Sequence, residues 1–407
     1  MPVLKNISTL YSCSLMGKQA DIHPLHRAAL VWNDSRIEWV GEESDLPAEY
    51  SSSNEVIDAG GNIVIPGLID CHTHLCFGGW RADEYEKRLS GVSYLEIAKA
   101  GGGILSTVKE TRHATEDELY IKASAMLDEM IESGVTSVEC KSGYGLSTEE
   151  ELKQLRVYRR LAEEKSVSIV STFLGAHTIP PEYRDDRKAY VDLLINEMIP
   201  AVAGQKLAAF CDIFVEDSAF TIPEARRILE NAKSAGLKLK VHADQLTTGG
   251  GAELAADLGA VSADHLERVS DKGIRRMQEA DVVAVSLPIA SLYTWQPYLN
   301  CRRLADAGVA VAVATDFNPG SAPCYDLPLA MMLACNHGRL TPAESLKGAT
   351  IYAAKAIGLE SITGSLETGK RADFNILAAP DINHWIYHFK RKPPIRTFAS
   401  GTEIKRT

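Results

Sequence analysis

Short apolar runs rich in β-branched residues alternate with helix-like patterns through the middle of the chain. Most of these runs are uninterrupted, as expected of strands that are buried on both faces of a parallel sheet. The predicted strands are Asn62–Asp70, Val135–Lys141, Ser168–Leu174, Cys211–Val215, Leu237–His242, Ala260–His265, Asp281–Leu287 and Val309–Asp316. Such repeated β-α units favour an α/β fold of the (β/α)8 TIM-like barrel type. A doubly wound open sheet is the alternative, because it shows the same alternation.

The helices between these strands begin with recognisable signals. Capping boxes are predicted at Thr115-x-x-Glu118, Ser147-x-x-Glu150 and Thr341-Pro342-x-Glu344. After the first of them, Leu119, Ala123, Met126 and Met130 fall on one helical face. We interpret this stripe as part of the core and not as a cofactor contact, because an apolar stripe at helical spacing is the ordinary mark of a packed helix.

The two ends of the chain differ from its middle. Residues 1–65 and 362–407 contain short strand-like runs between turn residues such as Gly60-Gly61 and Gly364. Neither end is long enough to make a stable sheet alone. We therefore predict that both ends pair into one small β-sandwich domain, and that residues 66–361 form the barrel domain.

Composition excludes several classes of protein. The 407 residues include 43 Lys and Arg against 54 Asp and Glu, a net charge of -11, which argues against a nucleic-acid partner. The apolar runs are too short to cross a membrane and the first residues show no signal-peptide pattern, so we expect a cytoplasmic protein without membrane contact. The eight cysteines include no C-x-x-C pair and are expected to be reduced thiols.

Side chains that can bind a metal follow four of the predicted strands. His72 and His74 end the first strand, where alternate residues point to the same face. His242, His265 and Asp316 end three other strands, and the carboxyl ends of barrel strands meet at the face where active sites lie. We predict that His72, His74, His242 and Asp316 ligate one metal ion.

Three imidazoles and one carboxylate suit zinc or iron(II) better than magnesium or calcium. An open position would hold water, whose pKa such a metal lowers to about 7. The alternative for each histidine is a buried, hydrogen-bonded core residue. It is weakest for His72 and His74, because it must explain two residues together.

These strand ends resemble the amidohydrolase superfamily in the blocks PGLIDCHTH, KVHAD, SADHLE and VATDFNPG. Other blocks resemble its imidazolonepropionase family, namely FGGWRADEYEKRLSGVSYLEIAKAGGGILSTV, ECKSGYGL, TFLGAHTIP and DFNPGSAP. The resemblance implies hydrolysis of 4-imidazolone-5-propanoate to N-formimino-L-glutamate in histidine degradation, with one zinc or iron ion per subunit of a homodimer. Glu216 lies at the strand-four position where binuclear relatives have a carboxylated lysine, so a single ion is expected. Glu216 itself is expected to be a loop carboxylate or to lie behind the ligands.

The implied substrate has a carboxylate and a planar ring. Arg81, seven residues after His74, is expected to hold the carboxylate, because a guanidinium is planar, always charged and can bond in a bidentate manner. The resemblance implies that the pocket is lined by Tyr94, Tyr144, His177, Gln245, Asn318, Gly320 and Ser321. A core position is the alternative for Tyr94, and a plain turn is the alternative for residues 318–321.

The acid–base residues are where this chain departs from part of the family. Gln245 stands where some members have a glutamate that is proposed to activate water, and a glutamine cannot accept that proton. We therefore assign water activation to the metal together with Asp316, and proton transfer to His265. Gln245 is expected to contact the ring of the substrate.

Three aspartates lie close to these residues in the sequence. Asp244 and Asp264 each adjoin a key histidine and are expected to point away from the site or to lie behind it, since adjacent strand residues face opposite sides. Asp70 shares the strand face of His72 and is a candidate to orient a ligand from below.

Two alternatives concern the activity. A sister enzyme that deaminates a heterocyclic base would share the four ligands and His265, but it has no need of Arg81 together with His177. A non-catalytic assembly protein on the same fold is the second alternative. Such proteins usually lose metal ligands, and all four are present in this chain.

Overall fold

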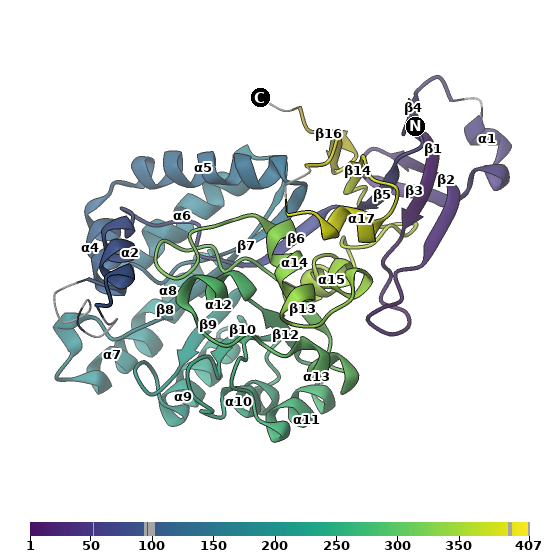
Figure 1. Ribbon diagram of the computed structural model, residues 1–407. Coiled ribbons are helices and arrows are strands. Elements are labelled where there is room, and N and C mark those ends of the chain that lie inside the picture. The colour runs from purple at the N-terminus through teal and green to yellow at the C-terminus, as the bar shows by residue number, and fades with distance from the viewer. Residues whose placement is uncertain (52, 93–95, 97–101, 390–392, 406–407) are drawn as a thin grey trace.

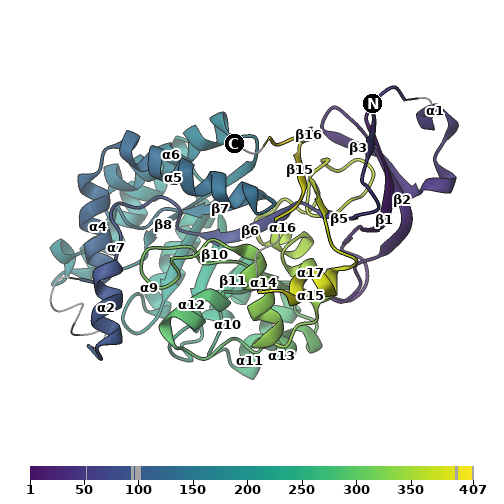
Figure 2. The ribbon, with the colours of Figure 1, turned by 45° about the horizontal axis from the view of Figure 1, so that its top comes forward.

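The computed structural model describes residues 1–51, 53–92, 96, 102–389 and 393–405. Two bodies are visible in Figures 1 and 2, a barrel surrounded by helices and a smaller sheet at one end of the molecule. Tyr94, which was predicted to line the substrate pocket, lies outside the described residues.

The barrel is built from parallel strands in the sequential order β13-β12-β11-β10-β9-β8-β7-β6. Their bounds are β6 Leu68–Thr73, β7 Val135–Lys141, β8 Ser168–Ala176, β9 Phe210–Val215, β10 Lys238–Ala243, β11 Ser262–His265, β12 Val283–Ser286 and β13 Val311–Val313. The first and last strands meet beyond β13, where the Asp316 amide donates to the His72 carbonyl at 3.0 Å and the His74 amide donates to the Phe317 carbonyl at 2.8 Å. The predicted barrel is therefore confirmed, and the doubly wound sheet is wrong.

The helices lie outside the barrel strands (Figure 1). They are α2 Ala82–Leu89, α4 Ile104–His113, α5 Glu116–Glu132, α6 Thr148–Glu164, α7 Arg187–Leu193, α8 Ile199–Gly204, α9 Ile222–Ser234, α10 Gly251–Leu258, α11 Asp271–Glu279, α12 Pro288–Thr294, α13 Cys301–Asp306, α14 Leu327–Asn336, α15 Pro342–Gly348 and α16 Ile351–Ala356. Two short helices lie near the chain ends, α1 Ala48–Ser51 and α17 Ile382–Tyr387.

Most of the predicted helix signals act as expected. Thr115 and Thr341 form complete capping boxes, and the stripe at positions 119, 123, 126 and 130 of α5 is buried. The box at Ser147 is wrong, because its side chain makes no capping hydrogen bond. Glu150 pairs instead with Lys153, one turn further along α6.

Both chain ends join in the second sheet, as predicted. Its order is β16-β15-β14-β5-β1-β2-β3, with β4 paired to β1. The bounds are β1 Val3–Tyr11, β2 Pro24–Asn33, β3 Arg36–Glu42, β4 Val56–Asp58, β5 Ile63–Pro66, β14 Phe374–Leu377, β15 Arg396–Ala399 and β16 Thr402–Glu403. The sheet curls so that its two ends face each other, since the ring of Trp32 lies 5.3 Å from Phe374 and 5.7 Å from Phe398. We propose that the domains divide as predicted, into 1–65 with 362–407 and 66–361.

The predicted first strand, 62–70, is wrong as a single element. Its first half is β5 of the small sheet, and its second half begins β6 of the barrel. The chain changes sheets at Gly67. The Gly67 amide donates to the Asp373 carbonyl of the small domain, whereas the Leu68 amide donates to the Gly134 carbonyl of the barrel. Only glycine fits there, because a Cβ would come within 2.2 Å of Thr136 Oγ1.

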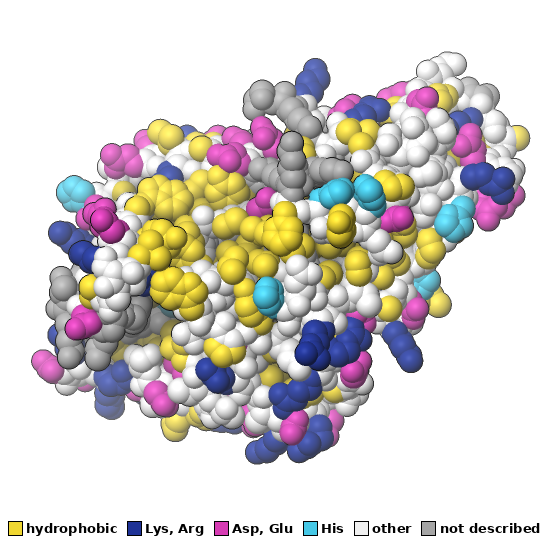
Figure 3. All heavy atoms as spheres, viewed as in Figure 1, with side chains coloured by type: hydrophobic (Ala, Val, Ile, Leu, Met, Phe, Trp, Pro, Cys, Tyr) yellow, Lys and Arg dark blue, Asp and Glu magenta, His cyan; other side chains and the backbone are white. Residues whose placement is uncertain are grey.

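Apolar side chains gather in a band on the face that carries α14 and α17 (Figure 3). Elsewhere on this face charged side chains are common. Within the described ranges no helix is both long enough and apolar enough to cross a lipid bilayer.

Candidate metal centre

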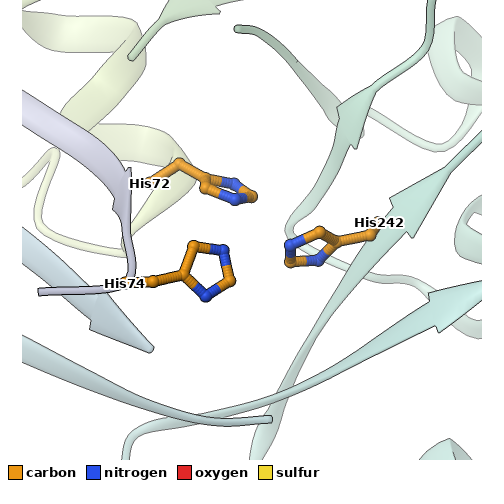
Figure 4. A group of neighbouring side chains, drawn as sticks. All are labelled: His72, His74 and His242. Carbon is orange, nitrogen blue, oxygen red and sulfur yellow. The ribbon is translucent and has the colours of Figure 1, made fainter. Parts of the chain in front are cut away.

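Three histidines from two barrel strands face one point at the carboxyl end of the barrel (Figure 4). His72 is in β6, His74 follows it, and His242 is in β10. One ring nitrogen of each lies within 4.8 Å of the corresponding nitrogens of the other two. All three side chains are buried, so a shared ion would be shielded from bulk water.

Asp316 and His265 complete this group. Asp316 Oδ1 lies 3.3 Å from His72 Nε2 and 3.5 Å from His74 Nε2. His265 groups with His72 and Asp316 within the same 4.8 Å limit. Both residues leave the strand direction, with φ of 56° at Asp316 and 77° at His265. These left-handed conformations turn the two side chains toward the site at the ends of their strands. The regular alternation of a strand would have directed them elsewhere.

A carboxylate lies behind each of two histidines. Asp264 accepts a hydrogen bond from His72 Nδ1 at 2.6 Å, and Asp212 Oδ2 lies 3.0 Å from His242 Nδ1. A carboxylate at Nδ1 keeps the proton on that nitrogen and leaves the lone pair on Nε2 for a metal. Asp264 and His265 are adjacent, yet both side chains are directed toward this site, with Asp264 behind His72. Regular strand alternation would send them to opposite sides, and the positive φ of His265 breaks that alternation.

The ionisation of this group suits metal binding. Burial, with the charge of Lys141 and the neighbouring His242, lowers the pKa of His72 to about 3. Burial also lowers the pKa of His74 to about 4, against the opposing effect of Asp316. Burial disfavours the Asp316 carboxylate, yet its contacts with His72 and His74 hold its pKa well below the usual range. At neutral pH the imidazoles therefore offer lone pairs and Asp316 offers a negative charge.

Two observations show that these residues fit a divalent metal ion. His72 Nε2, His74 Nδ1 and His242 Nε2 are buried and have no hydrogen-bond partner among the described residues, although buried polar atoms are normally paired. The buried charges around the site are also unbalanced. Four carboxylates (Glu139, Asp212, Asp264 and Asp316) surround only two ammonium groups (Lys141 and Lys240). A divalent cation at this point would offset part of the excess negative charge.

The rings of His177 and Tyr144 lie beside that of His74, and their contact with substrate stays a prediction. The His177 ring stacks on His74, with centroids 5.2 Å apart, and the Tyr144 ring lies 5.4 Å from His177. His177 Nδ1 donates to the Gly143 carbonyl at 3.0 Å. Burial beside His74 and His242 places the pKa of His177 well below its usual value. Its ring is therefore neutral, with the lone pair on Nε2.

Arg81 reaches the segment that follows Asp316, but it is already paired. Its Nε and Nη2 both lie 2.8 Å from Glu84 Oε2, and its Nη1 lies against the backbone of Gly320. A second guanidinium, that of Arg88, approaches the Gly320 carbonyl with Nη2 at 3.4 Å. Two arginines of the segment after β6 therefore converge on one glycine.

Asn318 and Ser321 are used within their own loop. The Asn318 side chain donates to the Asp316 carbonyl at 2.7 Å and accepts the amides of Gly320 and Ser321, both at 2.8 Å. The plain-turn interpretation therefore describes the Asn318 side chain, and its contact with substrate stays a prediction. The turn holds Gly320 against Arg81.

Gln245 lies half-buried on the loop after β10, and the residues around it fix that loop. Glu216 accepts the amides of Leu246 and Thr247 at 2.7 and 3.2 Å, so it is a loop carboxylate, as expected. Asp244 accepts four amides at the start of α10 and points away from the metal ligands. Asp70 does not orient a ligand directly. Its carboxylate accepts the amide and hydroxyl of Thr315, next to Asp316.

Sequence reasoning missed the charged groups beneath the ligands. Glu139, Lys141, Asp212 and Lys240 each lie inside a barrel strand and are fully buried. A signal was present, because a charged residue inside an otherwise apolar buried strand must find a partner of opposite charge. Arg88 was missed as well, and its spacing of seven residues from Arg81, about two helical turns, could have indicated it.

Comparison with known proteins identifies the family. The amidohydrolase family model matches residues 63–404. The imidazolonepropionase of Symbiobacterium thermophilum is 51% identical over 364 residues, covering 88% of this chain and 86% of that protein. That of Geobacillus kaustophilus is 48% identical over 375 residues, covering 91% and 88%. The chain therefore belongs to the amidohydrolase family and, within it, to the imidazolonepropionases.

Solved structures show the same fold at lower identity. A triazine hydrolase variant superposes with a TM-score of 0.76 at 18% identity, covering 98% of this chain and 94% of that chain. Escherichia coli guanine deaminase superposes with a TM-score of 0.74 at 14% identity, covering 100% and 99%. At these identities the likeness concerns the fold alone.

Proposed function

We propose that this protein is a metal-dependent hydrolase that opens the ring of 4-imidazolone-5-propanoate to give N-formimino-L-glutamate. Water adds to the ring carbonyl carbon, the bond from that carbon to the ring nitrogen breaks, and the nitrogen takes up a proton. The observation that carries the proposal is the buried group of His72, His74, His242 and Asp316 in a chain 51% identical to an imidazolonepropionase.

A zinc or iron(II) ion held by these four side chains would polarise the carbonyl and lower the pKa of water. Nitrogen and oxygen ligands accept both metals, and we propose one ion per subunit. Elemental analysis of the purified protein tests the identity and number of the ions. A protein with no bound metal, or with two ions per chain, would contradict this part of the proposal.

We assign proton transfer to His265. Burial disfavours its imidazolium, but the carboxylates of Glu267, Asp316 and Asp264 outweigh this and hold its pKa above the usual value. Glu267 Oε1 lies 3.8 Å from His265 Nδ1. An imidazole can accept a proton at one ring nitrogen and return it in a later step. Gln245 can only orient the substrate ring.

We propose that Arg81 and Arg88 recognise the substrate carboxylate and that His177 contacts the ring. The pair with Glu84 neutralises Arg81, whereas Arg88 has no carboxylate within 4.0 Å among the described residues. Together they supply one uncompensated positive charge for an anionic substrate. Because His177 Nε2 carries a lone pair, it accepts a hydrogen bond, which suits a ring N–H and not a carboxylate.

The decisive experiment is a spectrophotometric assay with freshly prepared 4-imidazolone-5-propanoate, with and without a chelator. We expect turnover that the chelator abolishes and that added zinc or iron restores. No turnover, together with ammonia release from a heterocyclic amine, would favour the deaminase alternative. A homodimer, a cytoplasmic location and the lack of a nucleic-acid partner stay predictions, of which light scattering tests the first.

A further inference from the structure

One ammonium group lies between the carboxylates that support the metal ligands. Glu139 and Lys141 are two residues apart in β7, so both side chains point to the same side of the strand. Lys141 Nζ donates to Glu139 Oε1 and to Asp212 Oδ2, each at 2.8 Å. It also lies 3.7 Å from Asp264 Oδ2. All four side chains are fully buried.

The two aspartates lead to different histidines. Asp264 Oδ2 is the atom that accepts from His72 Nδ1, and Asp212 Oδ2 is the atom nearest to His242 Nδ1. His72 is on the first barrel strand and His242 is on the fifth. Lys141, on the second strand, therefore contacts the supports of two ligands that are distant along the barrel wall.

We propose that Lys141 is a positioning residue for the metal centre. Its ammonium holds Asp212 and Asp264 in place. Each aspartate then stays in contact with Nδ1 of its histidine, and Nε2 of that histidine is directed toward the ion. Without this charge, three carboxylates would face one another at close range in a buried site, and their side chains would separate. The inference rests on the metal-dependent function proposed above.

Two other buried lysines provide matched comparisons. Lys240 Nζ lies 3.7 Å from Asp264 Oδ2, but it donates to Ser262 Oγ and to the Ala356 carbonyl. Within the described part of the chain it makes no ion pair with Asp212. Lys347 donates to the carbonyls of Met16, Lys18 and Asp21 and touches none of the ligand supports. Lys141 thus contacts the aspartates behind two ligands, Lys240 contacts only the aspartate behind His72, and Lys347 contacts neither aspartate.

The test compares Lys141→Met, Lys240→Met and Lys347→Met in the full-length protein stripped of metal. Zinc affinity is measured by competition with a chromophoric chelator, and the ligand geometry is measured from the visible spectrum of the cobalt(II) form. We expect Lys141→Met to lower zinc affinity about 10- to 100-fold, the range typical of lost outer-shell partners, and to change the cobalt spectrum. Lys347→Met is expected to lower the melting temperature while its zinc affinity stays within about twofold of wild type. The zinc affinity of Lys240→Met is expected to lie between those of the other two variants.

A second variant keeps the proposal testable should Lys141→Met not fold. Glu139→Gln with Lys141→Gln removes one charge of each sign and leaves Asp212 and Asp264 in place, so the same loss of affinity is expected. Glu139→Gln alone should keep wild-type affinity, because the lysine still contacts both aspartates. Wild-type zinc affinity and cobalt spectrum in either Lys141 variant would overturn the proposal. If wild type binds metal and turns over substrate in that case, the proposed function stands and only the role of Lys141 fails.

Discussion

Arg81 and Gly320 touch across the seam where the barrel closes. A Cβ at Gly320 would lie 1.9 Å from Arg81 Nη1 and 2.6 Å from its Cζ, so only glycine permits this position of the guanidinium. Arg81 follows the first barrel strand, and Gly320 follows the last. The contact therefore joins the two ends of the barrel sheet at the site where the substrate carboxylate is expected.

Gly320→Ala tests this contact. The methyl group would displace the guanidinium, and we expect KM to rise about tenfold, equivalent to about 1.4 kcal/mol, with a smaller change in kcat. Steady-state kinetics with 4-imidazolone-5-propanoate measures the change. Gly204→Ala is the control, because a Cβ there meets no atom within 4 Å. An unchanged KM in Gly320→Ala would show that the position of Arg81 does not matter for substrate binding.

Arg88 is expected to contribute to the same carboxylate site. Its Nε is buried without a hydrogen-bond partner among the described residues, and its guanidinium carbon lies 4.7 Å above the Tyr293 ring. Loss of a charged hydrogen bond costs about 1.5–3 kcal/mol, so Arg88→Met should raise KM about 10- to 100-fold. The surface variant Arg160→Met is the control. With a 4-imidazolone that lacks the propanoate, the two variants should be equal, and a difference there would count against a carboxylate contact.

Removal of the metal should destabilise the protein as well as inactivate it. Without the ion, the four carboxylates around the site outnumber the two ammonium groups and repel one another. The stability that the metal adds by binding the folded but not the unfolded state is also lost. At a metal concentration about 1,000 times Kd this contribution is about 4 kcal/mol. Calorimetry of metal-free and reloaded protein should show a lower Tm for the former. Equal Tm values, with the metal content verified, would contradict the charge argument.

His265→Ala separates the proton-transfer assignment from the metal site. We expect kcat to fall about 10²- to 10⁴-fold, the contribution typical of general acid–base groups. Gln245→Ala should reduce kcat less, because an amide cannot move a proton. The metal content of both variants must match that of wild type for the comparison to hold. Near-wild-type kcat in His265→Ala would assign the proton transfer elsewhere.

Much of the fold and all of the proposed ligands could be predicted from the sequence because the signals are local. The period of apolar residues reports burial within a strand, and the spacing of His72 and His74 reports a shared strand face. Residues at the carboxyl ends of parallel strands share one edge of the sheet, regardless of the length or conformation of the loops. For the same reason His242, His265 and Asp316 could be placed at the site before their distances were known.

The sequence by itself determined the barrel, the pairing of the two chain ends and the residues that meet at the candidate metal site. Only the tertiary structure decided which groups support them: Asp264 behind His72, Lys141 between two aspartates, and Glu84 on Arg81. It also decided that residues 62–70 divide between two sheets. The physical reason is that strand period and spacing act within one element, whereas an ion pair joins side chains from separate elements, and its partner depends on how those elements pack.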